Sequence, residues 1–207
     1  MTRIGFVFIS MFLFFHVDVF ATKLIKVTVI DEQFLMVYFK DGEVIYRDDA
    51  TGPSAFSGHD VAEGDDELLI FGKELNIEIA SQAGSWLLSS PDDTGYGTQG
   101  KQPVAVHRKA KVNNTDHEWN YRLDHWIFLK LPHSLKQGAS YRLEINPDTH
   151  TDVTDTRFTH DIFNNISEAV HVNMIGYTPN SPVKSADLYL WMGDGGARDY
   201  RSFEGNT

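Results

Sequence analysis

The chain has 207 residues, a formal net charge of -11 that comes from 29 acidic and 18 basic side chains, and no cysteine. This negative charge disfavours binding to nucleic acid phosphates and to anionic lipid surfaces, so we expect neither as a partner. The lack of cysteine excludes thiol catalysis, zinc–thiolate centres and disulfide-rich scaffolds.

The N-terminus has the pattern of a secretory signal peptide. Arg3 supplies an early positive charge, the apolar run Ile4–Phe15 follows, and Ala21 is a small residue at a plausible cleavage point. The run is shorter than the roughly 20 apolar residues that a membrane span needs. We therefore expect a signal peptide over residues 1–21 and a secreted, periplasmic or cell-surface protein without a membrane partner after cleavage. The alternatives are an N-terminal anchor and a first strand of the fold.

Alternating apolar and polar residues predict strands along most of the remaining chain. The predicted strands are Leu24–Ile30, Phe34–Lys40, Glu43–Tyr46, Leu68–Phe71, Leu75–Ala80, Val104–Val112, Glu118–Leu123 and His125–Leu131. The fourth and fifth of these are expected to pair through the short turn between them. No stretch carries the apolar stripe of a long helix, so the expected fold is an all-β sandwich of the Ig-like or fibronectin type.

A tyrosine-corner pattern supports this fold. Leu135, Gly138 and Tyr141 are spaced three residues apart and run into an alternating strand. In Ig-like sandwiches such a tyrosine donates or accepts a hydrogen bond across the corner between two strands. An ordinary hairpin with an incidental tyrosine is the alternative. The sandwich is expected to span residues 22–162.

Acidic residues are abundant enough to supply a pair of catalytic carboxylates. The candidates lie in turns or in one acidic run: Asp41, Asp48, Asp49, Asp92, Asp93 and residues 63–67. Turn positions are usually solvated, and a glycosidase-type acid needs an environment that raises its pKa. We therefore expect solvated acids there and no catalytic residue in this chain.

The chain contains histidines, carboxylates and serines that are candidates for a metal site or a nucleophile. The polar segment that follows the predicted sandwich strands contains His150, Asp152, Asp155, His160 and Asp161. Their spacing matches neither a helical zinc motif nor a calcium loop, which favours a polar linker between domains. The serines lack a nucleophile elbow. We expect no metal and no cofactor.

Exposed aromatic rings are the remaining candidates for ligand contact. Trp86, Trp119 and Tyr121 could stack against a sugar, since exported sandwiches often bind carbohydrate in this way. A second sheet that covers Trp119 and Tyr121 is the favoured alternative. Trp126 is expected in the core, because its strand is apolar on both faces.

The segment 169–207 contains, in order, a strand that reaches Asn173, the pivot Gly176-Tyr177-Thr-Pro179, Ser181-Pro182-Val-Lys184 and the strand Leu188-Tyr-Leu190-Trp191. In these elements it resembles the start of the N-terminal Ig-like domain of cellulases of glycoside hydrolase family nine. Met174 stands where that family has Gln. A turn over residues 192–196 and a returning strand Ala197–Phe203 are expected to follow.

The resemblance implies that residues 163–207 begin a truncated second Ig-like domain, because two or three strands cannot close such a sandwich. It further implies a secreted glycoside hydrolase that acts on a plant-type polysaccharide, with its catalytic domain downstream in the same polypeptide. This chain would then be the non-catalytic N-terminal region. The alternative is an exported carbohydrate-binding or adhesion protein of tandem Ig-like modules. An independent enzyme within the first sandwich is a weaker hypothesis.

Overall fold

The structure is a computed structural model that describes residues 21–45, 67–116, 118–172 and 176–201. The expected signal peptide up to residue 20, Asp48, Asp49, the acids at 63–66 and Met174 lie outside these ranges. Ala21, the last residue of the expected signal, is buried and forms a bridge with Lys73. No helix in the described ranges has the length and apolar character needed to span a bilayer.

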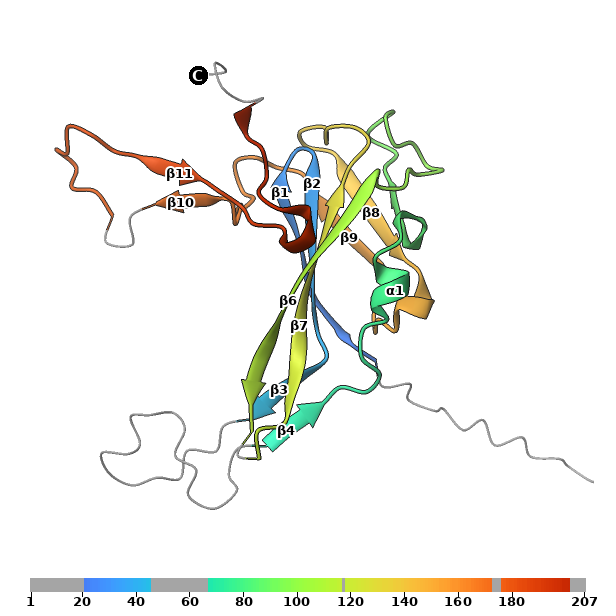
Figure 1. Ribbon diagram of the computed structural model, residues 1–207. Coiled ribbons are helices and arrows are strands. Elements are labelled where there is room, and N and C mark those ends of the chain that lie inside the picture. Colours follow the sequence, from blue (N-terminus) through green and yellow to red (C-terminus); the bar gives the residue numbers. More distant parts are fainter. Residues whose placement is uncertain (1–20, 46–66, 117, 173–175, 202–207) are drawn as a thin grey trace, which may run out of the picture.

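Two antiparallel sheets form the body of the molecule (Figure 1). The four-stranded sheet has the order β1 (Lys23–Asp31), β2 (Phe34–Lys40), β7 (Tyr121–Lys130) and β6 (Ala105–Thr115). The three-stranded sheet has the order β5 (Trp86–Ser89), β8 (Ser140–Ile145) and β9 (Asp155–Thr159). Two hairpins, β3 (Gly42–Ile45) with β4 (Glu67–Ile70) and β10 (Val170–Val172) with β11 (Ala186–Leu188), lie outside these sheets.

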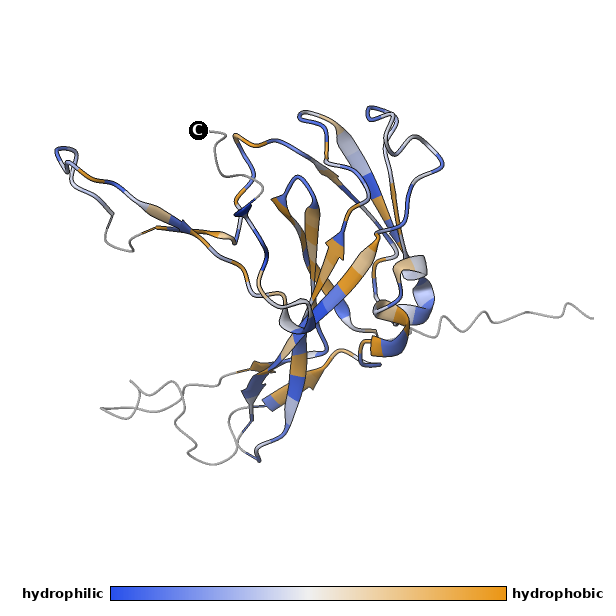
Figure 2. Cartoon of the chain, turned by 45° about the horizontal axis from the view of Figure 1, so that its top comes forward, coloured by the Kyte–Doolittle hydropathy of each residue, from blue (hydrophilic) through white to orange (hydrophobic). Residues whose placement is uncertain are grey.

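The core fills the space between the two sheets. It is made of alternate residues of both, including Leu35, Val37 and Phe39 of β2 and Leu143 and Ile145 of β8. Figure 2 shows hydrophobic residues along the strands of the body and hydrophilic residues at the turns between them. The period-2 pattern therefore gives the structure that it predicts, and the all-β sandwich is confirmed.

The tyrosine corner is also confirmed. The Tyr141 hydroxyl accepts a hydrogen bond from the backbone N–H of Lys136 at 2.7 Å and donates one to the Asp93 carboxylate at 2.5 Å. Leu135 is buried beneath the connection. Gly138 has a φ of +77°, a conformation that a residue with a side chain adopts at a cost.

Three local predictions are wrong. Residues Ile77–Ala80 form the one-turn helix α1 rather than a strand, because the Asn76 side chain caps its N-terminus and only Leu75 and Ala80 face the core. Consequently β4 pairs with β3 and not with this segment. The two strands expected on either side of Asp124 are one strand, β7, in which Asp124 accepts a hydrogen bond from Tyr38.

Three short 3₁₀ helices complete the fold: Ala83–Ser85 (η2), Pro147–Thr149 (η3) and Gly193–Gly195 (η4).

The outer face of the four-stranded sheet is partly covered by the C-terminal part of the chain. We call residues 190–200 the strap. Leu190 and Met192 of the strap pack against Ile30, Phe34 and Phe128. This contact explains why β7 is apolar on both faces; Trp126, at the margin of the covered area, is half-buried and stacks on Tyr38 with 4.9 Å between ring centroids.

Polar contacts and close backbone packing hold the strap on the sheet. The Asp194 carboxylate accepts a hydrogen bond from the backbone N–H of Arg108 in the edge strand β6, at 2.7 Å. A Cβ on Gly193 would lie 2.0 Å from the Arg108 carbonyl oxygen. Arg198 forms an ion pair with Asp31 at 3.0 Å and lies over the Phe34 ring. The strap is therefore tightly fitted to the first sandwich, although it lies beyond residue 162.

The hairpin β10–β11 projects from the body (Figure 1). Its paired residues put Val170, Val172, Ala186 and Leu188 on one face, and all of them are exposed. Beyond it, Trp191 pairs with Ala197 across a tight turn, as expected. The expected returning strand Ala197–Phe203 is wrong over the described residues, because only the bridge at Ala197 forms and residues 198–201 are not a strand; residues 202–203 lie outside the described ranges.

Candidate functional site

The connection between β6 and β7 is a tight loop that is fixed by its own hydrogen bonds. Asp116 Oδ1 accepts from the backbone N–H groups of Glu118 at 2.9 Å and Asn120 at 2.8 Å. The backbone N–H of Trp119 donates to the Asp116 carbonyl at 3.1 Å, and that of Asp116 donates to the Asn120 carbonyl at 3.0 Å. These bonds restrain Asp116 and residues 118–120.

Trp119 occupies an unfavourable backbone conformation in this loop. Its φ is +67°, in the left-handed region, where a large side chain costs about 1–3 kcal/mol. The side chain gains nothing from packing in return, since the residue is 79% exposed. The hydrogen bonds around Asp116 thus hold a large ring in solvent at a conformational cost. Such strain is typical of functional positions.

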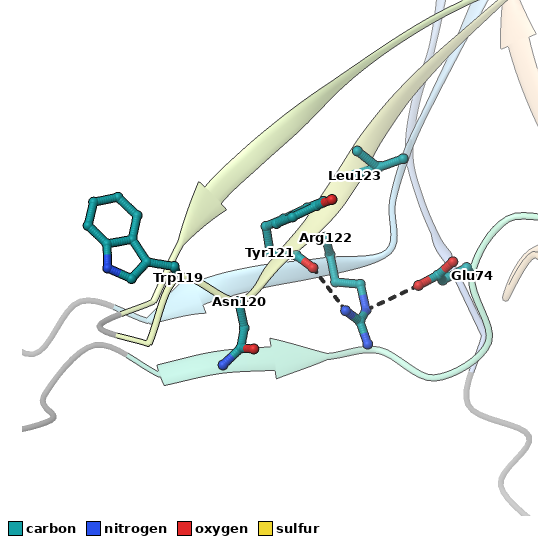
Figure 3. A pocket seen from close by; sticks show the side chains of 6 residues that line it. All are labelled: Glu74, Trp119, Asn120, Tyr121, Arg122 and Leu123. Carbon is teal, nitrogen blue, oxygen red and sulfur yellow. Dashed lines mark hydrogen bonds and ion pairs between the residues drawn. The ribbon is translucent and has the colours of Figure 1, made fainter.

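A shallow cavity of about 410 Å³ lies beside this ring and is lined by Glu74, Trp119, Asn120, Tyr121, Arg122 and Leu123 (Figure 3). Arg122 Nη1 donates to the Tyr121 carbonyl at 2.9 Å, and Arg122 Nε lies 3.4 Å from Glu74 Oε1. Figure 3 shows the Trp119 ring projecting from the loop, away from the Asn120 side chain, and the Tyr121 ring along β7. The cavity therefore combines apolar ring surface with an amide, a guanidinium and a carboxylate.

The position of the cavity follows from unequal strand lengths. β6 and β7 have 11 and 10 residues, whereas the strands of the opposite sheet have four to six. The long pair therefore extends past the second sheet towards β3 and β4 (Figure 1). Tyr121 points to the side of the sheet that is core elsewhere, yet it is 51% exposed. The expectation that a second sheet covers Trp119 and Tyr121 is wrong for this reason.

Trp86, the third aromatic candidate, belongs to the core. It is 1% exposed, and its indole N–H donates to the Ala80 carbonyl at 2.9 Å. Its ring contacts Phe39 of the opposite sheet. A buried ring with a satisfied N–H presents no face to a ligand. The prediction that Trp86 stacks against a sugar is therefore wrong, and Trp86 is a core residue.

Two acids that were expected in solvent are buried instead. Asp93 accepts from the Tyr141 hydroxyl and from the Gly95 backbone N–H at 2.9 Å. Burial alone would raise the pKa of Asp93, but these hydrogen bonds outweigh it and the pKa is lowered. The same burial and the bond to Asp93 raise the pKa of Tyr141. This carboxylate fixes the tyrosine corner, and its lowered pKa favours the ionised form.

Asp41 is the second buried acid. Its Oδ1 accepts from the Leu75 backbone N–H at 2.9 Å, and its Oδ2 lies 2.7 Å from His125 Nε2. Burial opposes ionisation, but the bonds from His125, Thr22 and Leu75 lower the pKa of Asp41 below its ordinary value. Turn chemistry at Asp41-Gly42 suggested an exposed position; only the three-dimensional arrangement places the histidine beside it.

The tautomer of His125 follows from its neighbours. Arg108 Nη1 is a donor and lies 3.3 Å from His125 Nδ1, so Nδ1 accepts and Nε2–H donates to Asp41. Both histidine nitrogens are therefore engaged, and neither can activate a nucleophile. The cluster of Asp41, His125 and Arg108 is a structural element that ties β7 to the residue preceding β3 and to β6.

Four of the five candidate metal ligands, His150, Asp152, Asp155 and Asp161, have other partners, whereas the buried Nδ1 of His160 has no hydrogen-bond partner among the described residues. Asp152 accepts from the Leu24 backbone N–H at 2.8 Å, Asp155 pairs with Arg142, and Asp161 accepts from Gln137 and Asn164. His150 Nδ1 lies 3.0 Å from the Glu74 carbonyl oxygen. Among the residues that the structure describes, no group of three or more acidic, histidine or cysteine side chains could hold a metal ion.

No family model matches this chain, and no curated protein or solved structure is significantly similar to it. The fold and the geometry of the Trp119 cavity thus define the class of protein: an all-β sandwich with a polar–aromatic surface cavity at one end.

Proposed function

We propose that this chain is a non-catalytic carbohydrate-binding region of a secreted polysaccharide-degrading enzyme, and that Trp119 contacts the sugar. The single observation that carries this proposal is a tryptophan held in solvent, at a strained φ, beside a polar cavity.

The chemistry of the cavity fits a neutral sugar. The apolar C–H faces of a pyranose pack against aromatic rings such as Trp119 and Tyr121. Asn120, Arg122 and Glu74 supply donors and acceptors for hydroxyl groups. Among the lining residues that the structure describes there is no serine, threonine, cysteine or histidine, and Glu74, their one carboxylate, is paired with Arg122. These residues suit binding and offer no nucleophile or base for hydrolysis.

Titration of the chain with soluble β-glucan oligosaccharides tests the proposal. We expect Trp119→Ala to raise Kd by at least about tenfold, equivalent to about 1.4 kcal/mol, because the ring face is lost. Trp191→Ala is the matched control, since Trp191 is also an exposed tryptophan, at 52%, but lies on the strap. Unchanged binding by Trp119→Ala, or no binding of any oligosaccharide by the wild-type chain, would refute the role of the cavity.

The link to a glycoside hydrolase is supported by a separate observation. The hairpin β10–β11 has one apolar face and one face with His171 and Asp187, as in a strand pair that covers a core. Two strands alone are marginally stable in water. We propose that this hairpin begins an Ig-like domain of the kind that the sequence resembles, in front of a catalytic domain.

This second proposal is tested on the gene. Its reading frame should continue past Thr207 into the remaining strands and a helical catalytic domain. The longer product should release reducing ends from soluble β-glucan, and the present chain should release none. A stop codon directly after Thr207, with a stably folded product, would contradict the proposal and favour a stand-alone binding protein.

A further inference from the structure

The outer face of the three-stranded sheet has an unusual charge arrangement. Across β5, β8 and β9 the register places Ser89 opposite Arg142, and Arg142 opposite Arg157. Like charges directly opposite each other on a sheet destabilise it. The chain has only 18 basic side chains, so two facing arginines are not expected by composition. A cavity of about 300 Å³ lies over them, with Pro91 and the hydroxyl groups of Ser89, Thr98 and Ser140 in its lining.

The two arginines differ in their partners. Arg142 Nε and Nη2 bind Asp155, with Nε at 2.7 Å, and Nη1 donates to Glu144 at 2.9 Å. These contacts fix the guanidinium of Arg142 in position. The side chain of Arg157 is exposed and makes no hydrogen bond or ion pair with the described residues, although its charge acts on Asp155. Its five N–H donors remain available to a ligand.

The surrounding groups restrict the kind of ligand. The two arginines are balanced by Asp155 and Glu144, so this face carries little net charge, which suits a ligand with one negative charge better than a doubly charged phosphate. A guanidinium binds a carboxylate through two parallel hydrogen bonds. The hydroxyls of Ser89 and Thr98 have no protein partner among the described residues and can bond to sugar hydroxyls.

We propose that this cavity is a second carbohydrate site, which binds a uronic acid residue with its carboxylate on Arg157. The site lies on the sheet opposite the one that carries the Trp119 cavity, and it does not depend on the function proposed for Trp119. Because the whole chain is acidic, an acidic polymer is attracted only where local cations gather, so its binding at this cavity should depend on Arg157.

Titration with trigalacturonic acid and with its carboxyl-reduced, neutral counterpart tests the proposal. The wild-type chain should bind the acidic trisaccharide at least about tenfold more tightly than the neutral one. Arg157→Gln should abolish this preference, and Arg157→Lys should restore only part of it because the forked donor is lost. Arg201→Gln, which removes another exposed arginine, should have no effect. Trp119→Ala should leave the preference intact, which separates this site from the first.

Stability provides an independent readout. Arg157→Gln removes one of two facing positive charges, so Tm should stay constant or rise while binding is lost. A lower Tm would show that Arg157 is structural. Equal binding of the two trisaccharides, unchanged binding by Arg157→Gln, or competition by inorganic phosphate as effective as that by trigalacturonate would each overturn the proposal.

Discussion

The sandwich body and the hairpin β10–β11 are both built from antiparallel strands with alternating residues, but their surroundings differ. In the body, the apolar face of each sheet lies against the other sheet, and residues such as Leu35 and Ile127 are inaccessible to solvent. In the hairpin, the equivalent apolar face of Val170 and Leu188 is exposed. The comparison shows that alternating residues identify the face of a strand that is to be buried. They do not identify the segment that buries it.

The strap provides an intermediate case. Leu190 and Met192 continue directly from β11, yet they are buried because they reach the outer face of the four-stranded sheet. The first sandwich therefore fixes the chain on the C-terminal side of the hairpin. If the hairpin is the start of a second domain, the strap would limit how far that domain can rotate.

The largest expected difference in stability is between replacing a tryptophan of the sandwich body and replacing one of the strap. Trp86→Ala should lower the free energy of unfolding by about 3–5 kcal/mol, because it leaves a cavity in the core and an unbonded carbonyl at Ala80. Trp191→Ala should change it by less than about 0.5 kcal/mol. Denaturant titration of both variants measures these values. A cost for Trp191→Ala near that of Trp86→Ala would mean that the C-terminal region is covered in solution, for instance in a dimer.

Removing the buried Asp41–His125 contact should lower the free energy of unfolding by nearly as much as Trp86→Ala does. Asp41→Ala leaves the donors of His125 and Leu75 without an acceptor, and each buried donor left unsatisfied costs about 1–3 kcal/mol. Urea titration of the purified variant at neutral pH provides the value.

The same residue predicts a pH dependence. The pKa of Asp41 is lowered in the folded protein, so its contribution is complete above the unfolded pKa of about 3.9 and is lost as the pH falls through the folded value. The stability difference between the wild type and Asp41→Ala should therefore be constant from about pH 7 to 5 and decrease below about pH 4. A difference that stays constant down to about pH 2 would show that the ionised carboxylate is not what stabilises the fold.

Replacing a glycine should have a smaller effect, which should differ between the strap and the hairpin. Gly193 and Gly176 have similar φ values, +68° and +79°, but a Cβ would collide with Arg108 only at Gly193 and would meet no atom within 4 Å at Gly176. Both alanine variants incur the backbone cost of about 1–2 kcal/mol locally, whereas Gly193→Ala should also displace the strap.

Hydrogen exchange at the Arg108 amide, which Asp194 protects, measures this displacement. Its exchange should accelerate in Gly193→Ala and stay unchanged in Gly176→Ala. Equal exchange in the two variants would mean that the strap is held by its side chains and adapts to the added methyl group.

Much of the candidate site could be located from sequence, but its exposure could not. Trp119 and Tyr121 were recognised because their residue types suit sugar contact, yet alternation favoured a covering sheet. The overhang of β7 past β8 is a difference in strand length between segments far apart in sequence, which no local pattern contains. The strained φ of Trp119 likewise depends on the bonds of Asp116.

The sequence by itself determined the all-β class, most of the strands and the tyrosine corner of Tyr141, because period-2 alternation and turn chemistry act over a few residues. Tertiary structure alone decided that Asp41 and Asp93 are buried, that Trp86 is core, that Arg142 faces Arg157 and that the strap covers the outer sheet. These features depend on which distant strands pair and where each strand ends, and that choice is made by the burial of the whole core rather than by any one segment.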